Sequence, residues 1–182
     1  PSSIRYGGVG VTRGGVRYDL EVTAISDEPY AYTNLANNDL SSGGMAQINL
    51  EGPHEGEGLA ARSIELQYCF VGGDEDDPLT YDAPVTLDGF QLSFYDFDRD
   101  AGSGADECLT IGGFDDFTLA EPTELLVFPA ADGDKTRFCS STEGTGADNP
   151  TSPYSLDATQ RARSVVLAFS NASCVTLSYS IS

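Results

Sequence analysis

The chain has 182 residues and a formal net charge of −20 at pH 7, from 9 Lys and Arg against 29 Asp and Glu. Its length fits a single domain. The charge excludes nucleic acid and anionic membranes as partners, because both are polyanions. No apolar run reaches the roughly 18 residues of a membrane span, so no membrane-spanning helix is expected. The chain begins at Pro1 without an apolar leader, so we expect a removed signal peptide or an excised segment.

Alternation of apolar and polar residues predicts strands along most of the chain. In chain order, these strands are expected at 16–24, 45–50, 64–70, 90–94, 109–111, 116–119, 135–139 and 175–181. Two further segments, 123–128 and 164–169, are apolar on both faces. That pattern is typical of central strands covered on both sides.

Turn residues separate these segments about every ten residues, which is typical of sandwiches and jelly rolls. The sequence therefore predicts an all-β fold, an antiparallel β-sandwich of jelly-roll type with about 8–10 strands. One short helix is expected near 155–163, with Ser155 as a possible N-cap. We expect a basic, Gly-rich arm or first strand over residues 1–18 and one sandwich domain over residues 19–182.

The cysteines stand out of phase with the apolar residues of their strands, so all four should point away from the main apolar face. An even number of cysteines in an acidic, Lys-poor chain predicts two disulfides and an extracellular location. Three connectivities are possible; we favour Cys69–Cys174 and Cys108–Cys139. The alternative is four free thiols in a cytosolic protein. Asn171 opens a glycosylation sequon, Asn-Ala-Ser.

The strongest chemical signal lies in residues 96–107, whose acidic side chains have the spacing of an EF-hand calcium loop. These residues are Asp96, Asp98, Asp100 and Glu107. The flanks are strand-like and position 6 of the loop is Ala101 instead of Gly, so an EF-hand itself is excluded. We expect a calcium loop inserted between two strands.

Asp148 and Asn149 could complete this calcium site from across the fold, since calcium prefers hard oxygen ligands. The alternative is a solvated acidic turn, because acidic clusters arise easily by chance in so acidic a chain.

The residues give little support to catalysis. The single histidine, His54, lies in a Gly- and Glu-rich loop, and no Gly-x-Ser-x-Gly motif accompanies it. The many carboxylates offer no distinct glycosidase pair, and Trp, which often stacks on sugar rings, is absent. We therefore expect that the protein is not an enzyme.

Three stretches resemble secreted β-sandwich ectodomains of algal and bacterial surface proteins. They are Phe90–Asp98 followed by Glu107, the loop from Gly144 to Pro150, and Leu156–Gln160 before an apolar strand. The resemblance covers about residues 45–180. It implies a calcium-stabilised jelly roll used in adhesion, matrix or carbohydrate recognition, and it carries over no catalytic residue.

Charge is unevenly distributed along the chain. Residues 1–18 contain Arg5, Arg13 and Arg17 and no acid, whereas the rest holds 6 basic and 29 acidic residues. Such an arm could pair as an added strand with a second copy, and head-to-tail pairing builds homo-oligomers or filaments. Equally, it could fold back as the first strand of its own sandwich.

Two functions follow from these patterns. The first is a non-catalytic extracellular structural or adhesive subunit, stabilised by calcium and self-assembling into a surface or matrix structure. The second is a calcium-dependent, lectin-like carbohydrate-binding module. Its stacking faces for glycans would be loop tyrosines, namely Tyr30, Tyr32, Tyr81, Tyr95 and Tyr154.

Overall fold

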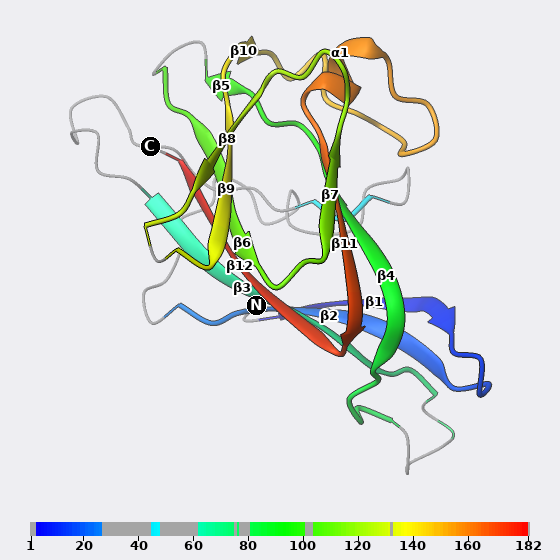
Figure 1. Ribbon diagram of the computed structural model, residues 1–182. Coiled ribbons are helices and arrows are strands. Elements are labelled where there is room, and N and C mark those ends of the chain that lie inside the picture. The colour runs from blue at the N-terminus through cyan, green and yellow to red at the C-terminus, as the bar shows by residue number, and fades with distance from the viewer. Residues whose placement is uncertain are drawn as a thin grey trace.

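Two antiparallel sheets packed face to face make up most of the molecule (Figure 1). A computed structural model describes residues 3–26, 45–47, 62–74, 76, 81–100, 104–131 and 133–181. The strands are β1 (Ser3–Val11), β2 (Arg17–Ala24), β3 (Arg62–Gly72), β4 (Leu87–Phe94), β5 (Arg99–Asp100), β6 (Glu107–Gly112), β7 (Asp116–Leu119), β8 (Leu125–Pro129), β9 (Lys135–Ser140), β10 (Glu143–Gly144), β11 (Val165–Ala172) and β12 (Cys174–Ile181). One helix, α1 (Ala158–Ala162), precedes β11.

The larger sheet has seven strands in the order β1-β2-β3-β12-β6-β9-β8, and the smaller has three in the order β4-β11-β7. A separate parallel pair joins β5 to β10. The predicted all-β, antiparallel sandwich is confirmed. That the strands connect as in a jelly roll stays a prediction.

Period-two alternation explains how the two sheets join. On β6, Leu109 and Ile111 point inward and are 1% and 0% exposed, and Leu167 of β11 is fully buried in the same core. Aromatic pairs connect the layers, for example Phe117 of β7 with Phe138 of β9 at 5.2 Å between ring centroids. Burial of these apolar side chains is the main stabilisation of the sandwich.

The two doubly apolar segments have different positions. Segment 164–169 forms most of β11, which is central in the smaller sheet as predicted. The prediction for 123–128 is wrong, because β8 is an edge strand with exposed side chains on both faces. Of the strand expected at 45–50, residues 48–50 lie outside the described part of the chain.

Helix α1 is shorter than predicted, and its N-cap is Asp157, not Ser155. The Asp157 side chain accepts a 2.9 Å bond from the Gln160 N–H, and the Gln160 side chain accepts a 3.0 Å bond from the Asp157 N–H. This capping box needs an acceptor three residues before Gln or Glu, which Asp157 satisfies. No helix in the described ranges has the length and apolar character needed to cross a bilayer.

The basic arm folds back on its own chain. Residues 3–11 form β1, which pairs antiparallel with β2 through a bulge between Tyr6 and Gly10. The Arg5 guanidinium donates to Asp19 Oδ2 at 2.8 Å and to the Gly72 carbonyl at 2.8 Å. These contacts hold the start of β1 against β2 and against the end of β3. In the described part of the chain, the other edge of β1 is one margin of the larger sheet.

Both predicted disulfides are present, and each joins directly opposed residues on neighbouring strands. Cys69–Cys174 bridges β3 and β12, and Cys108–Cys139 bridges β6 and β9, with Cα atoms 4.1 Å apart in each pair. Along its strand, each cysteine alternates with side chains that face the core, as the apolar–polar alternation of the sequence predicted. Cys108 and Cys139 are nevertheless buried, at 1% and 5% exposure.

Candidate functional site

The predicted calcium loop lies at one end of the sandwich, where β5, β10 and α1 meet (Figure 1). After β4 the chain runs through Asp96 and Asp98 into β5, which pairs with β10. The Arg99 N–H donates to the Thr142 carbonyl at 2.8 Å. The first part of the loop is therefore held against the segment that links β9 to β10.

Three of the predicted ligands come together at this end. The charge of Asp98 raises the pKa of both Asp96 and Glu107, and the charge of Asp96 also raises that of Glu107. Burial, and then the charges of Asp98 and Asp148, raise the pKa of Asp96 to about 6. Asp96 also has a positive φ of 69°, a backbone conformation that non-glycine residues adopt rarely and that often marks a functional site.

Glu107 is the most perturbed carboxyl group of this end. Burial is the first cause, and the charges of Asp98 and Asp96 add to it, so that its pKa rises to about 8. The Tyr179 hydroxyl and the Asp98 N–H both donate to Glu107 and oppose this rise. In turn, burial and the Glu107 charge raise the pKa of Tyr179. A cation beside these oxygens would favour ionised Glu107.

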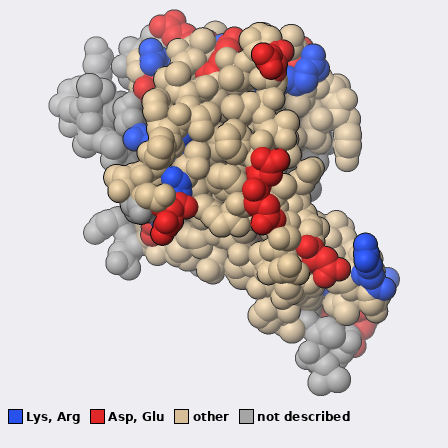
Figure 2. Space-filling view, in the orientation of Figure 1, with Lys and Arg blue, Asp and Glu red and all other residues tan. Residues whose placement is uncertain are grey.

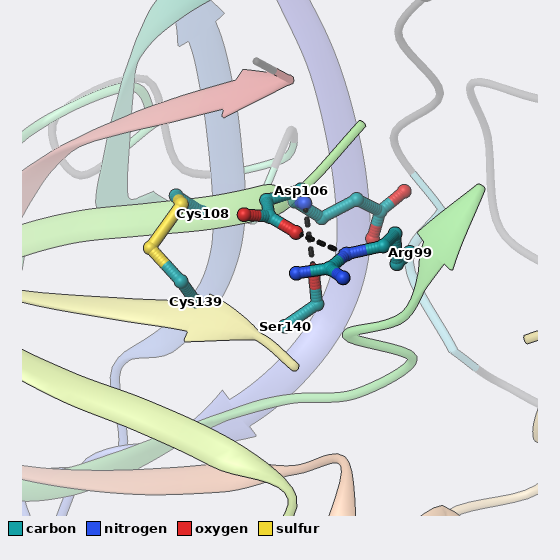
Figure 3. The surroundings of a disulfide bond; sticks show 6 residues. Arg99, Asp106, Cys108, Cys139 and Ser140 are labelled. Carbon is teal, nitrogen blue, oxygen red and sulfur yellow. Dashed lines mark hydrogen bonds and ion pairs between the residues drawn. A yellow bond between two sulfur atoms is a disulfide. The ribbon is translucent and has the colours of Figure 1, made fainter. Parts of the chain in front are cut away.

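The start of β6, where Glu107 lies, is fixed from behind. The Glu107 N–H donates to Ser140 Oγ at 2.9 Å. Figure 3 shows the neighbouring Cys108–Cys139 bridge, with Ser140 beside it and with the ion pair between Arg99 Nε and Asp106 Oδ1 at 2.6 Å. Because the disulfide joins β6 to β9 one residue away, it limits the movement of the Glu107 backbone.

Gly144 of β10 makes room for the Asp98 carboxylate. A Cβ atom at this position would collide with Asp98 Oδ2 and Cγ. The close approach of a backbone to a side chain is one of the situations that require glycine. Gly144 thus sets the position of Asp98 at the site.

Arg163 is the cation that faces this group of acids. It is 7% exposed. It donates to Glu124 Oε2, Asp148 Oδ2 and the Glu143 carbonyl, each at 2.8 Å. Its Nη1 lies 3.8 Å from Asp98 Oδ2. The guanidinium offsets part of the negative charge, and its hydrogen bonds join the segments before β8, at β10 and after β10 into one end of the fold.

The remaining predicted ligands have different surroundings. Asp148 lies beside the group, but its carboxylate accepts bonds from the Thr145 N–H at 2.8 Å and from Arg163. Asn149 is exposed. The side chain of Asp100 lies outside the described part of the chain. The structure therefore has Asp96, Asp98 and Glu107 at the same end of the fold, within electrostatic range of one another, and Asp148 in an ion pair with Arg163.

The chemistry of these donors fits a hard cation. All are oxygens, two of the acids are disfavoured as anions, and added positive charge relieves their repulsion. Among the described residues, no set of three or more His, Cys, Asp or Glu side chains is arranged as a ready metal-binding group. Asp96, Asp98 and Glu107 are thus candidate ligands, and a bound cation would have to bring their carboxylates closer to one another.

Sequence reasoning did not find Arg163, Glu124, Gly144 or Tyr179. Their roles come from contacts between segments far apart in the chain, such as the 39 residues between Glu124 and Arg163. Local spacing carries no signal for such contacts. The sequence offered a clue only for Gly144, because the loop from Gly144 to Pro150 is one of the stretches that resemble secreted β-sandwich ectodomains.

The three candidate sugar-stacking tyrosines in the described ranges have different surroundings. Tyr154 is 95% exposed, whereas Tyr81 lies under the Arg5 guanidinium at 4.7 Å from its ring centroid. Tyr95 is half-buried, and Tyr30 and Tyr32 lie outside the described ranges. His54 also falls outside them.

The sequon residue Asn171 is exposed near the turn between β11 and β12, with a positive φ of 50°. Its position is compatible with a glycan. Glycosylation at Asn171 stays a prediction.

Comparison with protein-family models, with curated proteins and with solved structures gave no match to this chain. The function is therefore argued from the fold and from the residues at this end of the sandwich.

Proposed function

We propose that the chain is a non-catalytic extracellular structural or adhesive domain, stabilised by calcium and able to self-assemble. The observation that carries the proposal is that Asp96, Asp98 and Glu107, which begin and end a loop with calcium-binding spacing, lie within electrostatic range of one another. Two disulfides are compatible with secretion into an oxidising compartment.

Calcium would act here as a structural link. Asp96 and Asp98 follow β4 in the smaller sheet, and Glu107 begins β6 in the larger one. An ion shared by these carboxylates would join the two sheets at one end. It would also offset the cost of ionising half-buried acids, and the remaining oxygens of its usual six to eight ligands would come from carbonyls and water.

Calorimetric titration with calcium tests the proposal. We expect the full chain to bind calcium, and we expect Asp98→Asn to weaken binding at least about tenfold by removing a charged ligand. Asp134→Asn is the matched control, because Asp134 is an exposed acid in the turn before β9. Absence of binding heat from the full chain at millimolar calcium would remove the calcium part of the proposal.

The alternative function is a calcium-dependent carbohydrate-binding module. It is favoured by the nearly complete exposure of Tyr154, because an aromatic face in water is suited to stacking on a sugar ring. A glycan array probed with and without calcium separates the two functions. Calcium-dependent glycan binding that Tyr154→Ala abolishes would favour the lectin-like function over the structural one.

A further inference from the structure

Exposed apolar side chains gather on the two edges of the larger sheet. Of the eight large hydrophobic residues exposed in the described ranges, five lie on β1 and β8. They are Val9 and Val11 on β1, and Leu126, Val127 and Phe128 on β8. In the part of the chain that the structure describes, these strands are the first and last of the seven.

The β8 edge lacks the features that usually prevent strands from pairing between molecules. Natural edge strands carry Lys, internal Pro or bulges. β8 reads Leu-Leu-Val-Phe-Pro, with no charged residue and with its proline at the last position. Leu126 and Phe128 are each 45% exposed and Val127 is 38% exposed. In Figure 2 tan surface covers the upper part of the region of β8 and β9, and a group of blue and red side chains lies at its lower end.

The β1 edge differs in charge. Val9 lies in its bulge and is 46% exposed, and Val11, beyond the bulge, is 61% exposed. The hairpin that follows bears Arg13 and Arg17, both exposed. In Figure 2 blue side chains mark the lower right of the molecule, where this hairpin ends.

We propose that the outer edge of β1 in one copy pairs with the outer edge of β8 in a second copy, so that the seven-stranded sheet of the described residues continues from molecule to molecule. This inference rests on the proposed self-assembling role and names the surface that performs it. Backbone hydrogen bonds would join the edges, and the apolar side chains would supply cross-strand contacts.

Charge favours this pairing over two β8 edges meeting each other. Exposed acids flank β8, with Glu121 before it and Asp134 in the turn after it. Pairing β8 with β8 would bring these like charges together across two copies. The arginine-bearing hairpin at the end of β1 instead offers opposite charge to the acid at one end of β8.

The contact is head-to-tail, so it generates an open assembly unless the rotation closes a ring. Seven strands spaced by about 4.7–4.9 Å give a rise of about 33 Å per copy. A twist of about 20–25° per strand rotates each copy by about 150° relative to the last. Such a rotation produces a helical filament with a subunit spacing of about 33 Å.

Cysteine cross-linking separates the possible contacts. Two single variants, Val11→Cys and Val127→Cys, are oxidised alone and as a mixture, and products are resolved on a non-reducing gel. We expect cross-linked pairs mainly in the mixture. Efficient dimerisation of Val127→Cys alone would show β8 pairing with β8 and overturn the inference, and so would the absence of a product in all three samples.

Electron microscopy and sedimentation of the unmodified full chain provide the second readout. We expect filaments with a subunit spacing close to 33 Å, and Val127→Lys should raise the concentration needed for assembly at least about tenfold. Tyr154→Lys is the control, since it adds the same charge at an exposed aromatic outside the sheet. A chain that assembles without cross-linking between Val11→Cys and Val127→Cys would overturn this inference alone, whereas a chain that stays monomeric would overturn the self-assembly in the proposed function as well.

Discussion

Replacing Glu107 with Gln should change stability in opposite directions with and without calcium. Glu107 lies at the first position of β6 with Asp96, Asp98 and Tyr179 around its carboxyl group. Glutamine has the same shape as the protonated acid but cannot ionise. The variant therefore removes both the cost of the buried charge and one calcium ligand.

The size of the effect follows from the raised pKa of Glu107, about 8 in the fold against 4.5 for the unperturbed group. A carboxyl group with a raised pKa stabilises the fold fully below pH 4.5, and this contribution is lost as the pH rises through about 8. At about 1.4 kcal/mol per pKa unit, the calcium-free protein should lose on the order of 3 kcal/mol from this group between pH 4.5 and 7.

Urea unfolding followed by circular dichroism at pH 5 and pH 8 measures this difference. In calcium-free buffer at pH 8, Glu107→Gln should be more stable than the wild type, and at pH 5 the two should nearly coincide. In millimolar calcium at pH 8 the order should reverse. Glu65→Gln, at an exposed position of β3, makes the same charge change and should show neither effect. A calcium-free Gln variant that is less stable than the wild type at pH 8 would refute the reasoning.

Two further predictions concern the structural links of the same sandwich. Arg163→Met should cost on the order of 1.5–3 kcal/mol in urea unfolding, because the partly exposed Glu124 and Asp148 lose their shared cationic partner. Arg163→Lys should recover only part of that loss, since one ammonium cannot reproduce the spread of guanidinium donors. Replacing both cysteines of Cys69–Cys174 with Ser should cost about 1 kcal/mol more than the same change at Cys108–Cys139, because the bridged residues are 105 positions apart against 31. Equal melting temperatures for the two double variants would contradict that entropic reasoning.

The sequence predicted those features that depend on local periodicity. The alternation at 16–24, 64–70 and 175–181 corresponds to β2, β3 and β12, because one face of each strand meets the core. The same phase placed Cys69 opposite Cys174 on the outer face. Period two determines the facing of a side chain, so it can also predict which cysteines can meet.

Features that depend on which strands are neighbours were harder to predict. An apolar run such as Leu125–Pro129 looks the same at the centre of a sheet as at its edge, and only the topology distinguishes these positions. For the same reason the acidic spacing at 96–107 could propose ligands, but it could not reveal that Arg163 shares their surroundings. That contact depends on packing between segments far apart in the chain.

The melting temperature of the full chain in calcium-free buffer and in millimolar calcium tests the central claim most directly. Calcium at 100 times its dissociation constant should stabilise the fold by about 2.7 kcal/mol, which corresponds to a rise of about 5–10 °C for a chain of this size. Calcium should raise the melting temperature of Asp98→Asn by no more than about half as much, because tenfold weaker binding leaves about 1.4 kcal/mol of stabilisation at the same calcium concentration, whereas Asp134→Asn should behave as the wild type. Superimposable wild-type curves in the two buffers would contradict a calcium-stabilised domain.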